Sequence, residues 1–179
     1  MNQVGDNLEW LEADGLGGFA SGTVSGIRTR RYHALLLPAT TPPTGRMVLV
    51  NGFDAWIETT QGRVALSSQR YVPDVIHPDG STRIEQFRAE PWPTWTYAVA
   101  PGLRVQQEIF VAHGRGTVVI AWRLLDPRHD DEVARLIVRP FLSGRDYHST
   151  HHENGICRAA AGIDDDAVTW RPYDGVPAV

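Results

Sequence analysis

The clearest pattern in the chain is an alternation of apolar and polar residues with a period of two. Over residues 103–111 (LRVQQEIFV) the odd positions are mostly apolar and the even positions mostly polar, which predicts a strand with one face in water. Phe110 breaks this alternation, and we expect its ring to meet a neighbouring element. The next run, 117–125 (TVVIAWRLL), is apolar at both parities, which predicts a central strand covered on both faces.

A short link, His113-Gly114-Arg115-Gly116, separates these two runs and suits a hairpin between antiparallel strands. Gly, Pro, Asp or Asn residues also separate the other strand-like segments, and no window carries the apolar stripe of a long helix. The sequence therefore predicts an all-β fold, an antiparallel two-sheet sandwich. Its further strands are expected over residues 8–13, 32–37, 47–58, 81–90, 95–100, 132–142, 156–160 and 167–171.

The length of 179 residues fits one domain, so we expect residues 1–179 to form a single sandwich without a linker or an internal repeat. The opening MNQVGDN is polar, which indicates neither a secretory signal nor a transmembrane helix. A lone Cys157 cannot form an internal disulfide, and we expect a cytoplasmic protein.

Charge narrows the classes of partner. The net charge of -4 is mild and evenly spread, which argues against a nucleic-acid partner and against a membrane anchor. All 17 basic residues are Arg, and the absence of Lys excludes both a Walker-type phosphate loop and Schiff-base chemistry. We therefore expect a neutral partner and no cofactor.

A glycine-rich segment spans residues 14–22 (DGLGGFASG). Its Gly15-x-Gly17-x-x-Ala20 spacing superficially matches a dinucleotide fingerprint, but the following Ser-Gly-Thr-Val-Ser-Gly does not suit the helix that such a site needs. We expect the glycines to supply positive φ angles in tight turns, and close approach of the backbone to a ligand remains an alternative.

Two polar clusters supply the candidate binding residues. The first is residues 28–33 (RTRRYH), where an Arg fork can hold a carboxylate so that it accepts hydrogen bonds from sugar hydroxyls. Simple pairing of these Arg residues with acids on a loop is the alternative. The second is residues 143–154 (SGRDYHSTHHEN), expected as a polar loop after a strand ending at Leu142.

Other chemistry receives less support. His148, His151 and His152 have helical spacing for a metal, but the neighbouring Gly and Ser-Thr residues disfavour a helix, and we expect no metal site. Glycoside hydrolysis needs two carboxyl groups at a set distance, and nothing distinguishes a catalytic acid among the loop residues Asp14, Asp146 and Glu153. We therefore assign no catalytic residue. The aromatics Trp92, Trp95 and Tyr97 suit closure of the core better than sugar stacking.

Three segments carry a resemblance to a known family. Residues 9–37, from EWLEADGLGGF to RTRRYHALLL, look like the opening motif of the bacterial and archaeal type of glycogen debranching enzyme, the amylo-α-1,6-glucosidase family. Residues 139–154 and 170–177 are similar to later parts of the same family and follow in the same order. Ala34 departs from the family pattern, which usually has Gly after the Tyr-His pair.

The resemblance implies an amino-terminal β-supersandwich that precedes a catalytic (α/α)-barrel in the same enzyme. That barrel would carry the acids that hydrolyse α-1,6-linked glucose, so this chain alone is expected to be inactive. Its expected partners are an α-glucan and the barrel, and a purely structural role between domains is the alternative. The residues expected to contact the glucan are Arg30, Arg31, Tyr32, His33, Arg145, Asp146, Tyr147 and His148.

Overall fold

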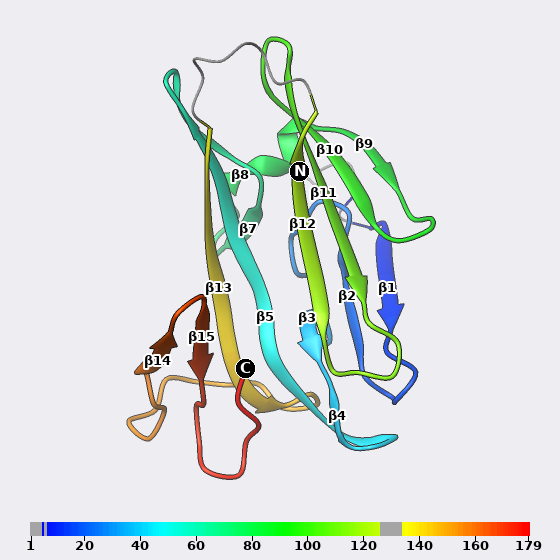
Figure 1. Cartoon of the computed structure of the whole chain (residues 1–179), viewed down its shortest axis with the longest axis vertical. Helices are drawn as coiled ribbons and strands as arrows, with labels where there is room; N and C mark the ends of the chain where they lie inside the picture. Colours follow the sequence, from blue (N-terminus) through cyan, green and yellow to red (C-terminus); the bar gives the residue numbers. More distant parts are fainter. Residues whose placement is uncertain (1–4, 6, 126–133) are drawn as a thin grey trace.

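The chain folds into two packed antiparallel sheets, which confirms the predicted all-β sandwich (Figure 1). The computed structural model describes residues 5, 7–125 and 134–179. The larger sheet has seven strands in the order β1-β2-β3-β5-β13, with β4 and β6 also paired to β5. The smaller sheet has four strands in the order β12-β11-β10-β9, and two hairpins, β7-β8 and β14-β15, complete the fold.

The strands are β1 (Glu9–Ala13), β2 (Phe19–Thr23), β3 (Ala34–Leu37), β4 (Ala39–Thr41), β5 (Thr44–Thr59), β6 (Gly62–Ala65), β7 (Ser68–Tyr71), β8 (Val75–Asp79), β9 (Ile84–Arg88), β10 (Thr94–Ala100), β11 (Leu103–Val111), β12 (Val118–Leu124), β13 (Arg135–Asp146), β14 (Ala161–Asp164) and β15 (Ala167–Trp170). A 3₁₀ turn, η1 (Gly80–Arg83), precedes β9. Among the described residues no helix has the length and apolar character needed to cross a membrane.

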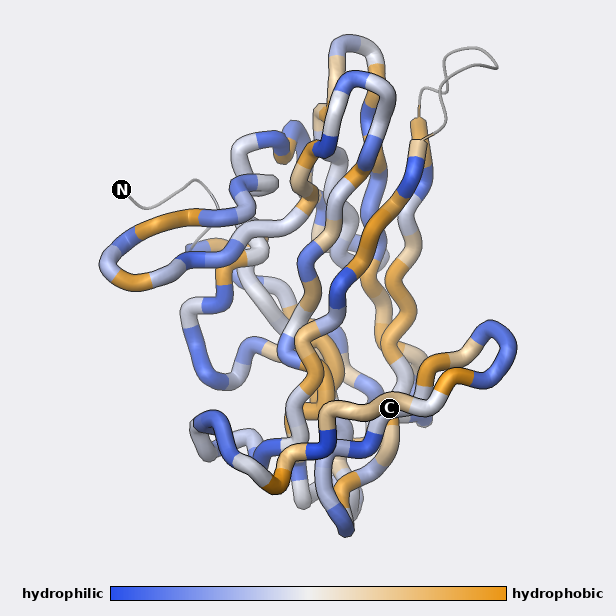
Figure 2. Tube along the Cα trace, turned by 90° about the vertical axis from the view of Figure 1, so that its left-hand side faces the viewer, coloured by the Kyte–Doolittle hydropathy of each residue, from blue (hydrophilic) through white to orange (hydrophobic). Residues whose placement is uncertain are grey.

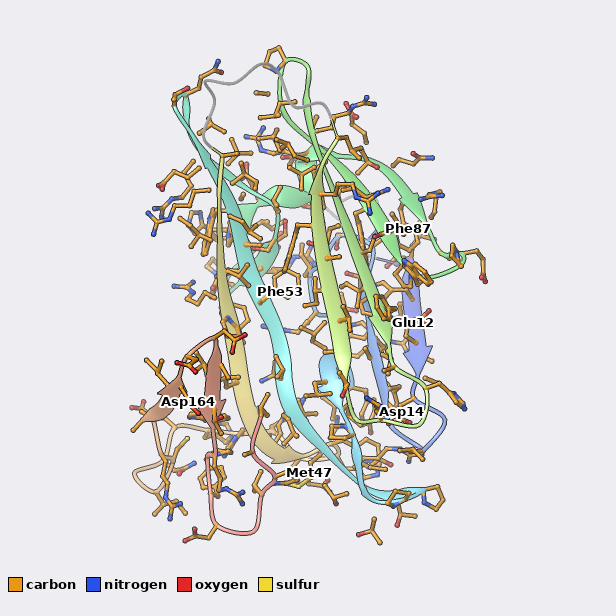
Figure 3. The ribbon with its side chains drawn as sticks, viewed as in Figure 1. Glu12, Asp14, Met47, Phe53, Phe87 and Asp164 are labelled. Carbon is orange, nitrogen blue, oxygen red and sulfur yellow. The ribbon has the colours of Figure 1, made fainter. Side chains whose placement is uncertain are left out.

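The hydrophobic core lies between the two sheets. Trp95 of β10 is 3% exposed, and its ring contacts Trp10 of β1 edge-on at 5.7 Å between centroids. Phe53 points from β5 toward β12, where its ring meets that of Trp122 at 5.5 Å (Figure 3). Hydrophobic residues accordingly concentrate along the central strands, whereas most loops at the two ends are hydrophilic (Figure 2). Trp95 and Tyr97 thus belong to the core, as the sequence favoured.

The predicted hairpin is confirmed: β11 pairs with β12 through the link at residues 113–116. Phe110 does meet a neighbouring element, because its ring lies 5.3 Å from that of Trp92 in the loop before β10. The prediction that residues 117–125 form a doubly covered central strand was wrong. β12 is an edge strand of the smaller sheet, and its outward residues, Val119, Ala121 and Arg123, are exposed.

Several expected strand limits also change. The segment 32–37 is a strand only from Ala34, so residues 30–33 form a turn. The segment 81–90 divides into η1 and β9, and residues 156–160 form no strand. Residues 132 and 133 of the segment 132–142 lie outside the described residues. β13 continues past Leu142 to Asp146, so the expected loop at residues 143–146 is in fact the end of a strand.

The glycine-rich segment forms the turn between β1 and β2. Gly15 and Gly17 have φ angles of 77° and 101°, which confirms the tight turns expected there. The carboxylate of Asp14 closes the turn by accepting hydrogen bonds from the backbone N–H groups of Leu16 at 2.7 Å and Gly18 at 2.8 Å. A strand, β2, follows these glycines rather than a helix, so the segment lacks the strand-turn-helix arrangement of a dinucleotide site.

Candidate functional site

The two polar clusters of the sequence meet on one surface of the larger sheet. Residues 30–33 form the turn before β3, and residues 145–148 form the end of β13 and the turn after it. In Figure 1 the carboxyl end of β13 curves across the bottom of this sheet. Arg31 Nη1 donates to the backbone oxygen of His148 at 2.8 Å, and Tyr32 Oη lies 3.2 Å from His148 Nδ1. The clusters therefore form a single unit, although 116 positions separate Tyr32 from His148.

Arg145 holds this unit together from beneath. It is 9% exposed, and its guanidinium donates to the backbone oxygens of Arg31, Asp146, Tyr147 and Ser149. Burial lowers the pKa of this guanidinium, while the Asp146 carboxylate opposes the change. Because its donors are used by main-chain oxygens, Arg145 is placed to order both loops rather than to reach a ligand.

Asp146 has a similar local task. Its carboxylate accepts the backbone N–H of His148 at 2.8 Å and so caps the turn after β13. Asp14, another acid considered for catalysis, is 2% exposed and caps the turn between β1 and β2. The hydrogen bonds of both acids are therefore those of turn caps.

Aromatic side chains form the outer part of the unit, which we call the aromatic platform: Tyr32 and His148, which are exposed, and Tyr147, which is half-buried. The Tyr147 and His148 rings lie 3.8 Å apart between centroids, and the Tyr32 ring lies 5.7 Å from Tyr147 and 5.8 Å from His148. Arg46 and Arg31 flank the platform, each with its guanidinium over a tyrosine ring. Such packing restricts the rings, and the exposed parts of Tyr32 and His148 are the surfaces on which a ligand can stack.

A groove of about 420 Å³ lies beside the platform. Leu11 and Ser21 are register partners on β1 and β2, and both line the groove. Side chains alternate between the two faces along a strand, and Trp10 packs inward against Trp95. Its neighbours Glu9 and Leu11 therefore point to the outer face of the β1-β2 pair, where the groove lies. The lining residues are Glu9, Trp10, Leu11, Phe19, Ser21, Arg30, Tyr32, His33 and Tyr147.

Glu9 is the site residue that the sequence analysis missed. Its Oε1 lies 2.7 Å from Arg30 Nε and 3.3 Å from His33 Nε2. The alternation along β1 places Glu9 on the same face as Leu11, but a single acid on a strand gave no reason to select it. The pairing of Arg30 with Glu9 agrees with the alternative that the arginines bind acids, and it also fixes that carboxylate at the groove.

His33 supports Glu9 from the buried side. The imidazole is 4% exposed, and its Nδ1 accepts the backbone N–H of Thr29 at 3.2 Å. An accepting Nδ1 carries no proton, so Nε2 carries the proton of the neutral ring and donates toward Glu9. Burial lowers the pKa of His33 below its ordinary value of 6.5, and the Glu9 carboxylate only partly offsets this effect. A ring buried in this way is unsuited to stacking on a ligand.

The state of His33 predicts a pH dependence of stability. The unfolded chain takes up a proton on His33 near pH 6.5, whereas the folded chain, with its lowered pKa, does so only at lower pH. The free energy of unfolding should therefore fall as pH drops below about 6.5. Urea unfolding between pH 7.5 and 5 should show a weaker pH dependence for His33→Gln than for the unchanged chain. The matched variant His152→Gln, at an exposed position, should keep the full pH dependence of the unchanged chain. If the free energy of unfolding changed with pH by the same amount in all three proteins, this account would be contradicted.

His151 of the second cluster turns away from the platform. His151 Nε2 lies 2.8 Å from Tyr173 Oη and 3.3 Å from Asn154 Nδ2, so it faces the carboxyl-terminal loop rather than His148. In the described part of the chain, no group of three His, Cys, Asp or Glu side chains is arranged to hold a metal ion.

Comparison with known proteins addresses the family of the chain. Residues 8–179 match the family model described as glycogen debranching enzyme N terminal. A search of curated proteins and a search of solved structures found no match. The family match spans nearly the whole sequence and includes both polar clusters. The chain therefore belongs to the glycogen debranching enzyme N-terminal family.

Proposed function

We propose that this domain binds α-glucan along the groove and the aromatic platform and supports the catalytic barrel of a glycogen debranching enzyme. The single observation that carries the proposal is the meeting of stacking and hydrogen-bonding groups in one open groove. Tyr32 and Tyr147 supply apolar ring faces, and Glu9, Arg30 and Ser21 supply polar atoms. Sugars present both kinds of surface, because the faces of a glucose ring are apolar and its rim carries hydroxyl groups.

The electrostatics of the groove agree with a neutral ligand. Glu9 and Arg30 form an ion pair at 2.7 Å, which places one negative and one positive charge in the same lining. A phosphate would meet the carboxylate, and a metal cation would meet the guanidinium. A polyhydroxyl ligand can use both groups as acceptor and donor.

In this proposal the predicted residues have unequal tasks. Arg30, Arg31, Tyr32, Tyr147 and His148 contact the glucan, whereas Arg145, Asp146 and His33 position these groups. The acids that cleave the α-1,6 bond belong to the barrel, since Asp14 and Asp146 cap turns. We place the enzyme in the cytoplasm, in keeping with the single exposed thiol of Cys157.

Isothermal titration calorimetry with maltoheptaose tests the proposal. Tyr32→Ala removes a ring of the platform and should weaken binding about tenfold, as expected for the loss of one aromatic contact. Tyr32→Phe keeps the ring and serves as the matched control, with binding within about twofold of the unchanged chain. Cellohexaose, a β-linked glucan, should bind more weakly than maltoheptaose. Equal affinity of Tyr32→Ala and the unchanged chain would contradict the proposed role of the platform.

A second candidate function is a structural interface with the barrel. It is favoured by Leu8 and Leu11, whose side chains are each 60% exposed, because Leu11 lines the groove. Exposed apolar residues at a groove are also a feature of protein interfaces. The absence of any heat of binding with maltoheptaose at millimolar concentration would favour this interface over the glucan site.

A further inference from the structure

We infer that Glu9 is a ligand-binding carboxylate that accepts hydrogen bonds from the vicinal 2- and 3-hydroxyls of one glucose unit. This inference rests on the proposed glucan-binding function and adds to it a residue and the part of the sugar that the residue recognises. The observations are the fixed orientation of the Glu9 carboxylate, the free oxygen that remains on it and its place in the lining of the groove.

The orientation of the carboxylate is set by two donors on the turn before β3. Arg30 Nε and His33 Nε2 both approach Oε1, at 2.7 Å and 3.3 Å. His33 is itself held by the backbone N–H of Thr29, so its proton is directed at Glu9. A carboxylate held in this way loses little rotamer freedom when a ligand arrives, which lowers the entropic cost of binding.

The second oxygen of Glu9 is available. Oε2 makes no hydrogen bond or ion pair with any residue in the described ranges 5, 7–125 and 134–179, and the side chain is 36% exposed. A carboxylate offers about four acceptor positions over its two oxygens. Arg30 and His33 take both acceptor positions of Oε1, so the two lone pairs of Oε2 are left to accept donors from the groove.

The chemistry of the glucan selects which hydroxyls can donate. In an α-1,4-linked chain, O1 and O4 of an inner unit form the linkages, and O6 forms the linkage at a branch point. The 2- and 3-hydroxyls stay free on every unit. They are adjacent on the ring, so both hydroxyls of one unit can donate to the two lone pairs of the free Oε2. The platform residues Tyr32 and Tyr147 line the same groove as Glu9, so stacking and hydroxyl recognition can act on one sugar.

Calorimetry on the 179-residue chain, with β-cyclodextrin as the probe, tests this inference. Glu9→Gln removes the charge while keeping the size, and it should weaken binding at least tenfold, because hydrogen bonds to a charged group are the stronger kind. Glu58→Gln is the matched control: Glu58 is also a strand carboxylate paired with an arginine, and its side chain is 35% exposed. This variant should bind as the unchanged chain does.

A second probe removes the donors from the ligand instead of the acceptor from the protein. β-Cyclodextrin methylated at O2 and O3 should bind the unchanged chain at least tenfold more weakly, and Glu9→Gln should cause no additional loss with this probe. This measurement on the unchanged chain does not depend on whether the variant folds. Glu9→Gln binding within twofold of the unchanged chain, or full affinity for the methylated probe, would overturn the inference and leave the glucan site standing. The absence of all binding by the unchanged chain would overturn the proposed function and this inference together.

Discussion

Replacing Trp95 by alanine should lower the free energy of unfolding by about 4 kcal/mol, as large-to-small changes of a buried aromatic do. The indole is 3% exposed and lies between Trp10 and Phe87, whose ring centroids are 5.7 Å and 5.0 Å away. Its Nε1 also donates to the backbone oxygen of Val24 at 2.8 Å. The substitution therefore opens a cavity between the two sheets and leaves a buried carbonyl without its donor.

Urea unfolding followed by far-ultraviolet circular dichroism measures this loss without relying on the fluorescence of the removed residue. Trp95→Phe is the companion variant, because it fills most of the cavity and removes only the N–H donor. It should cost about 1–2 kcal/mol. A loss below 1 kcal/mol for Trp95→Ala would mean that the two sheets do not pack around this residue.

The second large effect is expected at the turn between β1 and β2, where Gly17→Ala should destabilise the fold by about 3 kcal/mol. Gly17 has a φ of +101°, which residues with a side chain rarely adopt. An added Cβ would lie 2.5 Å from the Pro43 oxygen and 2.9 Å from Pro43 Cα. Both neighbouring atoms are backbone, so the contact cannot be relieved by moving a side chain. The strain and the clash therefore add.

Gly114→Ala separates the two causes. Gly114 also has a positive φ, +74°, but an added Cβ would have no other atom within 4 Å. This variant should lose only about 1 kcal/mol, from backbone strain alone. Thermal unfolding of both variants by calorimetry provides the comparison, and equal losses would contradict the close approach of the β1-β2 turn to Pro43.

The strands that could be predicted from the sequence are those whose own residues alternate between apolar and polar. The run 103–111 alternates strictly enough that β11 has the expected limits. β2 was missed because its sequence, FASGT, is short and contains glycine. The structure gives a reason for Gly22, since an added Cβ would lie 3.3 Å from the ring of Trp10. A glycine that makes room for a tryptophan on a paired strand cannot be told from a turn glycine without that partner.

β12 illustrates a second limit. The pairs Val118-Val119 and Ile120-Ala121 place apolar residues on both faces, and the sequence cannot show whether a second layer covers the outer one. The structure has β12 at the edge of its sheet with Val119 36% exposed. Burial on both faces is therefore a property of the neighbouring strands and not of the run itself.

For the candidate site, residue types were more predictable than their tasks. Both polar clusters could be selected from composition and from the family motifs. Their contact through Arg31 and His148, and the buried position of Arg145, depend on how β13 meets the turn before β3. Glu9 was overlooked because its importance comes from Arg30 and His33, which orient it, and from the groove beside them.

The central claim, that an α-glucan lies in the groove and on the aromatic platform, is tested most directly by titrating the isotope-labelled chain with maltoheptaose in two-dimensional NMR. The account predicts amide shifts at residues 30–33 and 145–148 and along the outer face of β1 and β2. The β7-β8 and β14-β15 hairpins should remain unchanged. Shifts absent from both loops at millimolar sugar, or confined to those two hairpins, would contradict it.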